Sequence, residues 1–146
     1  MVSDTNDIGT PLLSDINTIQ IRVIDDGTGP ISVWFGRLSL VDIGTQAETI
    51  IETFESEHGY LKRGISGKQE DDKSYSVDGL QSLKLTTDGD GRPVFTRKTG
   101  ISKATDFTGK TIKLWVRISD LSQLQELRVT VTNDEFKNYR NFWIFR

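Results

Sequence analysis

Apolar and polar residues alternate in short runs along much of this chain, and clusters of Gly, Asp and Asn separate the runs. The clearest run covers residues 111–119, where every second position is apolar: Ile112, Leu114, Val116 and Ile118. Successive side chains of a β-strand point to opposite faces, so a period of two predicts strands that bury one face. Residues 18–23 and 126–132 repeat the pattern.

We predict about eight strands, because similar runs rich in Ile, Val, Thr and Trp recur between turn-forming clusters. The predicted strands cover residues 18–23, 31–41, 50–55, 80–87, 93–98, 111–119, 126–132 and 141–145. Residues 25–30 and 87–91 have hairpin turn chemistry, since Gly and Asp tolerate positive φ. Helical periodicity is hard to find. The predicted fold class is therefore all-β, an antiparallel β-sandwich of the jelly-roll kind.

Two segments depart from regular alternation. The apolar positions of residues 31–40 change parity after Phe35, which predicts a β-bulge at Gly36-Arg37. Residues 59–79 are polar and contain several glycines, and we expect one irregular strand within a long loop there.

Composition limits the classes of partner. The 146 residues suit one domain spanning 1–146. The net charge of −3 comes from 18 basic and 21 acidic residues that are scattered along the chain, so we expect no nucleic-acid partner. Cysteine is absent, which excludes disulfides and thiolate metal sites. No apolar run of about 18 residues exists, so we expect no membrane partner.

Residues 1–15 are polar and acidic and lack the features of a secretory signal. A location outside the cell would then require a domain cut from a larger protein, a virion component or another export route.

From Thr53 onward the chain resembles the jelly-roll carbohydrate-binding modules attached to polysaccharide-acting enzymes and to bacteriophage tail proteins, which have a galactose-binding-like β-sandwich. The matching pieces are Phe54-Glu55, residues 79–85, residues 106–110 leading into Leu114-Trp115-Val116, and Asn138-Tyr139 before Phe142-Trp143-Ile144. The resemblance implies a carbohydrate-binding function and an extracellular or virion location.

Residues 1–43 resemble the closing hairpin of that family, which normally comes last and here comes first. Residues 44–52 would then link what are usually the two ends, and residues 53–146 would form the rest of the sandwich. This order resembles a circular permutation, which folded domains tolerate because their termini often lie close together. The alternative is that residues 1–42 complete a neighbouring copy by strand exchange. Residues 1–17 either replace a strand that the family places after Phe142-Trp143-Ile144, or an edge is left open.

The resemblance also implies a structural calcium ion held by Glu55 and by an acid on the closing strand. Gly36-Arg37 stands where the family often has that acid, and a guanidinium repels a cation. Calcium needs six to eight oxygen ligands. Oxygens from Asp71, Asp72 and Asp78 are the remaining candidates, although a solvated loop also explains these residues.

Sugars have apolar faces and many hydroxyl groups, so their sites combine an exposed aromatic ring with hydrogen-bonding groups. Trp115, between Lys113 and Arg117, is out of phase with its buried neighbours and is the main candidate for ligand contact; the alternative is that it packs under a loop. Other out-of-phase residues are candidates for the same sheet face if the strand order permits: Gln20, Arg22, Arg128 and Thr130.

The remaining aromatic residues have less specific signals. Trp34 is either on the solvent side or covered by a loop, whereas Trp143 is interpreted as structural. Three tyrosines near loops either close the core or line a binding rim, with the structural role favoured: Tyr60, Tyr75 and Tyr139.

Three hypotheses follow. The first is a non-catalytic module that binds an anionic polysaccharide through an aromatic and basic face. The second is a structural module of a virion tail, fibre or cell-surface array that contacts copies of itself or virion proteins. The third, a hydrolase, has little support, because His58 is the only histidine and no nucleophile motif accompanies it.

Overall fold

The computed structural model describes residues 4–101 and 105–146, and the first three residues of the predicted 1–43 hairpin segment lie outside this range. These residues form eleven strands, two short 3₁₀ turns and no α-helix. The strands are β1 (Asp4–Ile8), β2 (Thr18–Asp25), β3 (Ser32–Asp42), β4 (Glu48–Glu52), β5 (Leu61–Arg63), β6 (Lys68–Asp72), β7 (Ser82–Thr86), β8 (Val94–Lys98), β9 (Lys110–Ile118), β10 (Leu124–Thr132) and β11 (Tyr139–Phe145).

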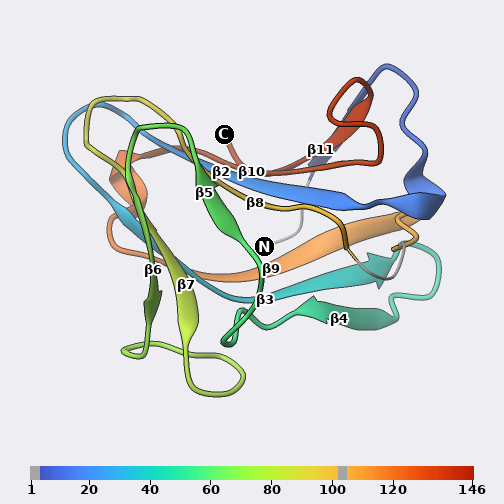
Figure 1. Ribbon diagram of the computed structural model, residues 1–146, viewed down its shortest axis with the longest axis horizontal. Coiled ribbons are helices and arrows are strands. Elements are labelled where there is room, and N and C mark those ends of the chain that lie inside the picture. The colour runs from blue at the N-terminus through green and yellow to red at the C-terminus, as the bar shows by residue number, and fades with distance from the viewer. Residues whose placement is uncertain (1–3, 102–104) are drawn as a thin grey trace.

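The strands form two antiparallel sheets that pack face to face (Figure 1). The six-stranded sheet has the order β1-β11-β10-β2-β8-β5. The five-stranded sheet has the order β4-β3-β7-β6, and β9 pairs along the other side of β3. The predicted all-β antiparallel sandwich is confirmed.

All eight predicted strands are present, and the structure adds three short ones. Each added strand lies at or next to a sheet edge: β1 pairs with β11, β5 with β8, and β6 with β7. The segment 59–79 thus holds two short strands instead of the one expected. Strands β1 and β6 lack apolar alternation because backbone hydrogen bonds to a neighbour, not burial of one face, hold them in place.

The core lies between the sheets and is filled by the alternating apolar residues. In β9, Ile112 and Leu114 are buried, as are the inward-facing residues of β2 and β10. Two pairs of aromatic rings pack within the core. The ring centroids of Phe35 and Phe54 are 6.1 Å apart, and those of Phe107 and Phe142 are 5.9 Å apart.

The bulge predicted at Gly36-Arg37 is confirmed. The register between β3 and β9 shifts between Phe35 and Arg37, so that Arg37 faces Trp115. The extra residue keeps Phe35 and Leu38 both in the core while the Arg37 side chain remains outside.

The first hairpin pairs with strands of its own chain. Strand β2 lies between β10 and β8, and β3 pairs with β4, β7 and β9. Strand β1 pairs with β11, the strand that contains Phe142-Trp143-Ile144. Of the two alternatives for residues 1–17, a replacement strand or an open edge, the structure therefore has the replacement strand. No helix among the described residues is long and apolar enough to cross a membrane.

Candidate functional site

Trp115 lies on the outer face of the five-stranded sheet. It follows Leu114, whose side chain is buried, and the alternation of β9 turns the indole outward, where it is 43% exposed. The prediction that this ring avoids the core is therefore confirmed. An exposed indole on a sheet offers a flat apolar surface to a ligand.

Two cations flank the Trp115 ring. The Arg37 guanidinium carbon lies 5.6 Å from the ring centroid, and Lys113 Nζ lies 5.2 Å from it. Arg37 donates two hydrogen bonds of 2.6 Å to Asp78, and the guanidinium holds the pKa of that carboxyl below its usual value. Lys113 pairs with Glu48 at 3.2 Å. These contacts fix the side chains that surround the partly exposed indole.

A hollow of about 180 Å³ opens beside Trp115. Its wall includes Trp34, Tyr75 and Arg117. The Trp34 and Tyr75 rings meet edge to face at 5.0 Å, and the Arg117 guanidinium lies 3.8 Å from the Tyr75 centroid. The lining also includes small residues that leave room for a ligand: Gly36, Ser76 and Ser82.

Trp34 is held by a hydrogen bond as well as by packing. Its indole Nε1 donates to Asp72 Oδ2 at 3.0 Å, and Lys84 Nζ lies 5.2 Å from the ring centroid. Hydrogen bonds from Ser74, then from Trp34, lower the pKa of Asp72 to about 2, so this carboxylate stays charged. Sequence reasoning left Trp34 undecided and favoured a structural role for Tyr75. Tyr75 lies in the loop between β6 and β7, and tertiary packing brings this loop against Trp34 in β3.

The other predicted binding residues lie on the opposite side of the sandwich. Arg22 is in β2 and Arg128 is in β10, and the two face each other in the six-stranded sheet together with Gln20 and Thr130. The expectation that they share a face with Trp115 is wrong, because β9 belongs to the other sheet. The predicted residues therefore divide into two groups: Lys113, Trp115 and Arg117 on one face, and Arg22 and Arg128 on the other.

Trp143 also faces outward, on the six-stranded sheet, since its neighbours Phe142 and Ile144 are buried. The ring lies 4.8 Å from the guanidinium carbons of both Arg128 and Arg146. Its Nε1 donates to Asn6 Oδ1 at 2.8 Å, which ties β11 to β1.

The residues proposed for calcium do not fit a calcium site in this arrangement. Both oxygens of Glu55 accept a hydrogen bond from the backbone N–H of Leu80, at 3.1 Å. Asp78 pairs with Arg37, and Asp71 contacts His58. In the part of the chain that the structure describes, no group of three or more Asp, Glu, His or Cys side chains is placed to hold a metal ion.

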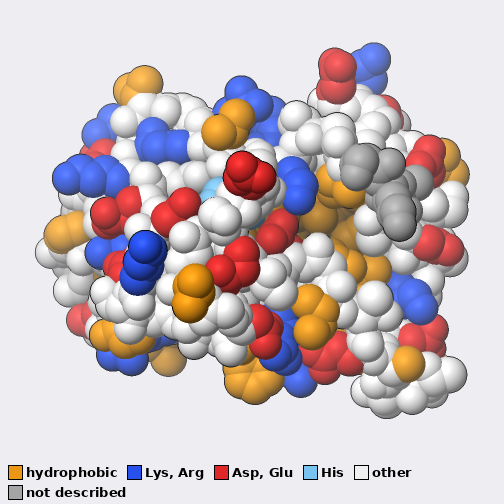
Figure 2. All heavy atoms as spheres, turned by 60° about the horizontal axis from the view of Figure 1, so that its bottom comes forward, with side chains coloured by type: hydrophobic (Ala, Val, Ile, Leu, Met, Phe, Trp, Pro, Cys, Tyr) orange, Lys and Arg blue, Asp and Glu red, His pale blue; other side chains and the backbone are white. Residues whose placement is uncertain are grey.

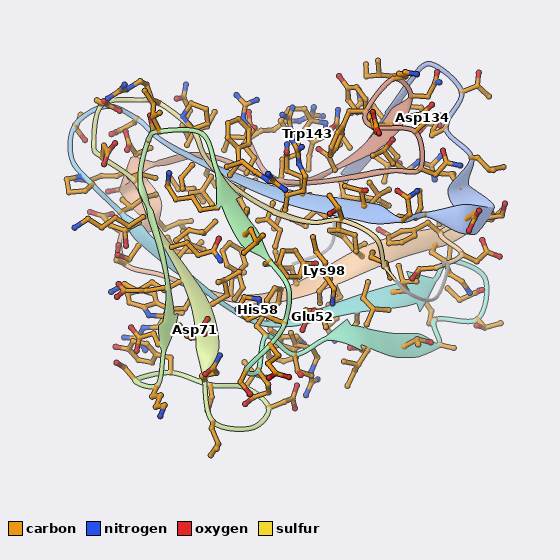
Figure 3. All side chains as sticks on the ribbon, viewed as in Figure 1. Glu52, His58, Asp71, Lys98, Asp134 and Trp143 are labelled. Carbon is orange, nitrogen blue, oxygen red and sulfur yellow. The ribbon has the colours of Figure 1, made fainter. Side chains whose placement is uncertain are left out.

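His58, Glu52 and Lys98 all line a second hollow of about 400 Å³, and Figure 3 labels these three side chains close to one another. Lys98 Nζ is 3.3 Å from Glu52 Oε2. The backbone N–H of Tyr60 donates to His58 Nδ1 at 3.0 Å, so in the neutral ring Nε2 carries the proton and donates to Asp71 at 2.9 Å. Both ring nitrogens are thus engaged, and their partners orient the imidazole within the loop.

Charged groups of both signs are mixed over the face that Figure 2 shows, with apolar side chains gathered in a hollow. The fold defines the chain as an antiparallel β-sandwich protein. Compared with known proteins, it matches no family model, no curated sequence and no solved structure.

Proposed function

We propose that the chain is a non-catalytic carbohydrate-binding module that recognises a polysaccharide at the outer face of its five-stranded sheet. The observation that carries the proposal is the Trp115 indole, 43% exposed and flanked by cations, next to an aromatic-lined hollow. Apolar C–H groups of a sugar ring pack well on an indole, and hydroxyl groups accept hydrogen bonds from neighbouring cations.

Arg117 is the donor that this site offers to a ligand. It stacks on Tyr75, and no carboxylate among the described residues lies within ion-pair distance of it. Arg37 and Lys113 already have carboxylate partners and mainly hold the Trp115 ring. A free guanidinium donates several hydrogen bonds in a fixed geometry, so it suits hydroxyl or carboxylate oxygens of an anionic polysaccharide.

The volume of the hollow beside Trp115 limits the size of the ligand that can enter it. Sites for drug-sized ligands have volumes of roughly 300–1,000 Å³, whereas this one is about 180 Å³. It suits a single sugar ring or a side group, with the rest of the polymer lying along the sheet.

A glycan array and polysaccharide affinity gels test the proposal. We expect saturable binding to at least one glycan, and a loss of about tenfold or more in affinity for Trp115→Ala, corresponding to about 1.4 kcal/mol. Leu121→Ala is the control, because it removes an exposed apolar side chain that belongs to neither sheet. Unchanged circular dichroism would show that both variants fold. Equal binding by wild type and Trp115→Ala would refute the proposal.

A second candidate function, a structural module of a virion tail, fibre or cell-surface array, has one observation in its favour. Strand β9 is nine residues long and has β3 as its one strand neighbour among the described residues. A strand from another copy or from a virion protein would extend such an edge. Lys110 and Lys113 lie on the same strand, and charged side chains there oppose unspecific pairing. Light scattering that shows no change in mass with concentration would contradict self-assembly.

A further inference from the structure

Two neighbouring rows of side chains cross the outer face of the six-stranded sheet. Residues paired across antiparallel strands point to the same face, so the register defines each row. One row combines arginine with aromatic rings, in the order Trp143, Arg128, Arg22 and Phe95. The next row is polar, in the order Asn141, Thr130, Gln20 and Arg97.

Positive charge on these rows exceeds negative charge. Arg22 and Arg128 share one carboxylate, Glu126, at 3.0 Å and 3.6 Å. Arg97 donates to a neutral group, Gln20 Oε1, at 3.1 Å and 2.7 Å, and no carboxylate of the described residues lies within ion-pair distance of it. Three guanidinium groups therefore face a single acid.

This charge is partly removed from water. The Arg128 side chain is 17% exposed, and its Nε is buried without a hydrogen-bond acceptor. Burial lowers the pKa of both Arg128 and Arg97. Arginine nevertheless keeps its proton in proteins, so the charge persists, and Glu126 and the Trp143 ring compensate the desolvation of Arg128 only in part. An anion arriving from solution would compensate it.

A hollow of about 320 Å³ lies at this place, lined by Gln20, Arg128, Thr130, Phe136 and Tyr139. Phe136 comes from the loop between β10 and β11, and the guanidinium of Arg97 lies 4.6 Å from its ring centroid. Asp134 holds that loop in shape by accepting hydrogen bonds from Asn138 N and Nδ2. Figure 3 shows Asp134 in this loop and Trp143 on the same outer side of the sheet.

We propose that this hollow is a second binding site, which takes the carboxylate of an acidic sugar residue. Arg128 and Arg97 supply the positive charge, the Thr130 hydroxyl and the Gln20 amide meet the sugar hydroxyls, and Phe136 and Tyr139 contact the ring. The site is on the face opposite Trp115 and does not depend on it. One chain would then contact two polysaccharide strands, one on each face of the sandwich.

The charge distribution favours one carboxylate over a polyphosphate backbone. The surplus comes from three arginines on neighbouring strands with a carboxylate, Glu126, between two of them, whereas a nucleic acid requires a stripe of cations that follows successive phosphates. The hollow is larger than the one beside Trp115, so it accommodates a sugar ring together with its carboxylate.

Calorimetric titration with an oligomer of galacturonic acid tests the site. We expect binding that weakens about tenfold or more in Arg97→Gln, while Trp115→Ala leaves it unchanged. The neutral methyl ester of the same oligomer should bind at least tenfold more weakly than the acid. Arg140→Gln is the matched control, because Arg140 belongs to the same sheet but already has a bidentate partner in Asp7.

Arg128→Met separates a structural role from a ligand-binding one. Glu126 keeps Arg22 as its partner at 3.0 Å when Arg128 is replaced, so an apolar side chain of similar length at position 128 leaves no buried carboxylate unpaired. We expect Arg128→Met to lose oligomer binding without a lower urea midpoint. If Arg128→Met loses much of its stability and Arg97→Gln binds the oligomer as tightly as the wild type does, the arginines serve the fold and the proposal is wrong.

Two other ligands have distinct outcomes. If inorganic sulfate binds as tightly as the oligomer with the same dependence on Arg97, the hollow is a site for free oxyanions and the acidic-sugar proposal is wrong. Tighter binding of single-stranded DNA than of the oligomer would likewise overturn it. Loss of binding to the glycan identified on the array by Trp115→Ala, with binding of the galacturonic acid oligomer intact, would support two separate sites.

Discussion

Asp25 has a buried carboxylate at the end of β2, where two turns meet. Its oxygens accept hydrogen bonds from the backbone N–H groups of Gly27, Gly89 and Gly91, at 2.8–2.9 Å. Burial raises the pKa of this carboxyl, but the hydrogen bonds from Thr87 and from the three glycines outweigh that effect, and the net pKa is lowered. One side chain therefore ties the turn after β2 to the turn after β7.

Asp25→Ala should lower the free energy of unfolding by about 3 kcal/mol, since it leaves three buried or partly buried N–H groups without an acceptor. Urea unfolding followed by tryptophan fluorescence measures the change. Asp26→Ala is the control, because Asp26 accepts only from the adjacent, exposed Thr28. Equal losses in the two variants would show that Asp25 does not connect the turns.

Strand β3 links the core to the Trp115 site through its bulge. Gly36 belongs to the wall of the 180 Å³ hollow, and a Cβ placed on it would collide with the Val77 side chain. The bulge and the loop after β6 therefore fit together only because residue 36 has no side chain. The same fit brings Asp78 to Arg37.

Gly36→Ala should destabilise the protein by about 1–2 kcal/mol, the range of overpacking in a well-filled space. Val77→Ala in the same chain should restore part of the loss, because it removes the methyl group that comes closest while the Cβ of residue 77 remains. Urea midpoints of the single and double variants test this coupling. If the double variant is no more stable than Gly36→Ala, the contact with Val77 is not the cause.

At the scale of the molecule, many carboxylates are more acidic when folded than when unfolded. The pKa of Asp42 falls to about 2, through hydrogen bonds from Thr45 and then Lys110, and that of Asp72 also falls to about 2. The pKa of each of the following is lowered too: Asp7, Asp25, Asp78, Asp90, Asp106, Asp120 and Asp134. Near pH 3 the unfolded chain therefore binds more protons than the folded one.

Thermal stability should be nearly constant from neutral pH to about pH 4.5 and should fall between about pH 4 and pH 2. The sign follows from the lowered pKa values: the stabilisation is complete above the unfolded pKa, near 4, and is lost as pH drops through the folded values. Thermal melts followed by circular dichroism at several pH values measure the melting temperature as a function of pH. A melting temperature that is unchanged down to about pH 2.5 would contradict the linkage.

The alternating pattern is sufficient to predict the strands that bury one face. Alternation is a local property of the backbone, and burial of every second residue can be read along a single segment, as in β9 and β10. The parity change at Gly36-Arg37 predicted the bulge for the same reason. The outward direction of Trp115 followed from its phase relative to Ile112 and Leu114.

The grouping of the strands into two sheets is not encoded in any single segment. That grouping depends on hydrogen bonds between segments far apart in the chain, and it placed Arg22 and Arg128 on the face opposite Trp115. Strand β1 and one of the two short strands β5 and β6 were also not predicted, since their neighbours supply the pairing and their own sequences carry little pattern. The loop that brings Tyr75 to Trp34 and Arg117 took its course from the same long-range packing, which no local period encodes.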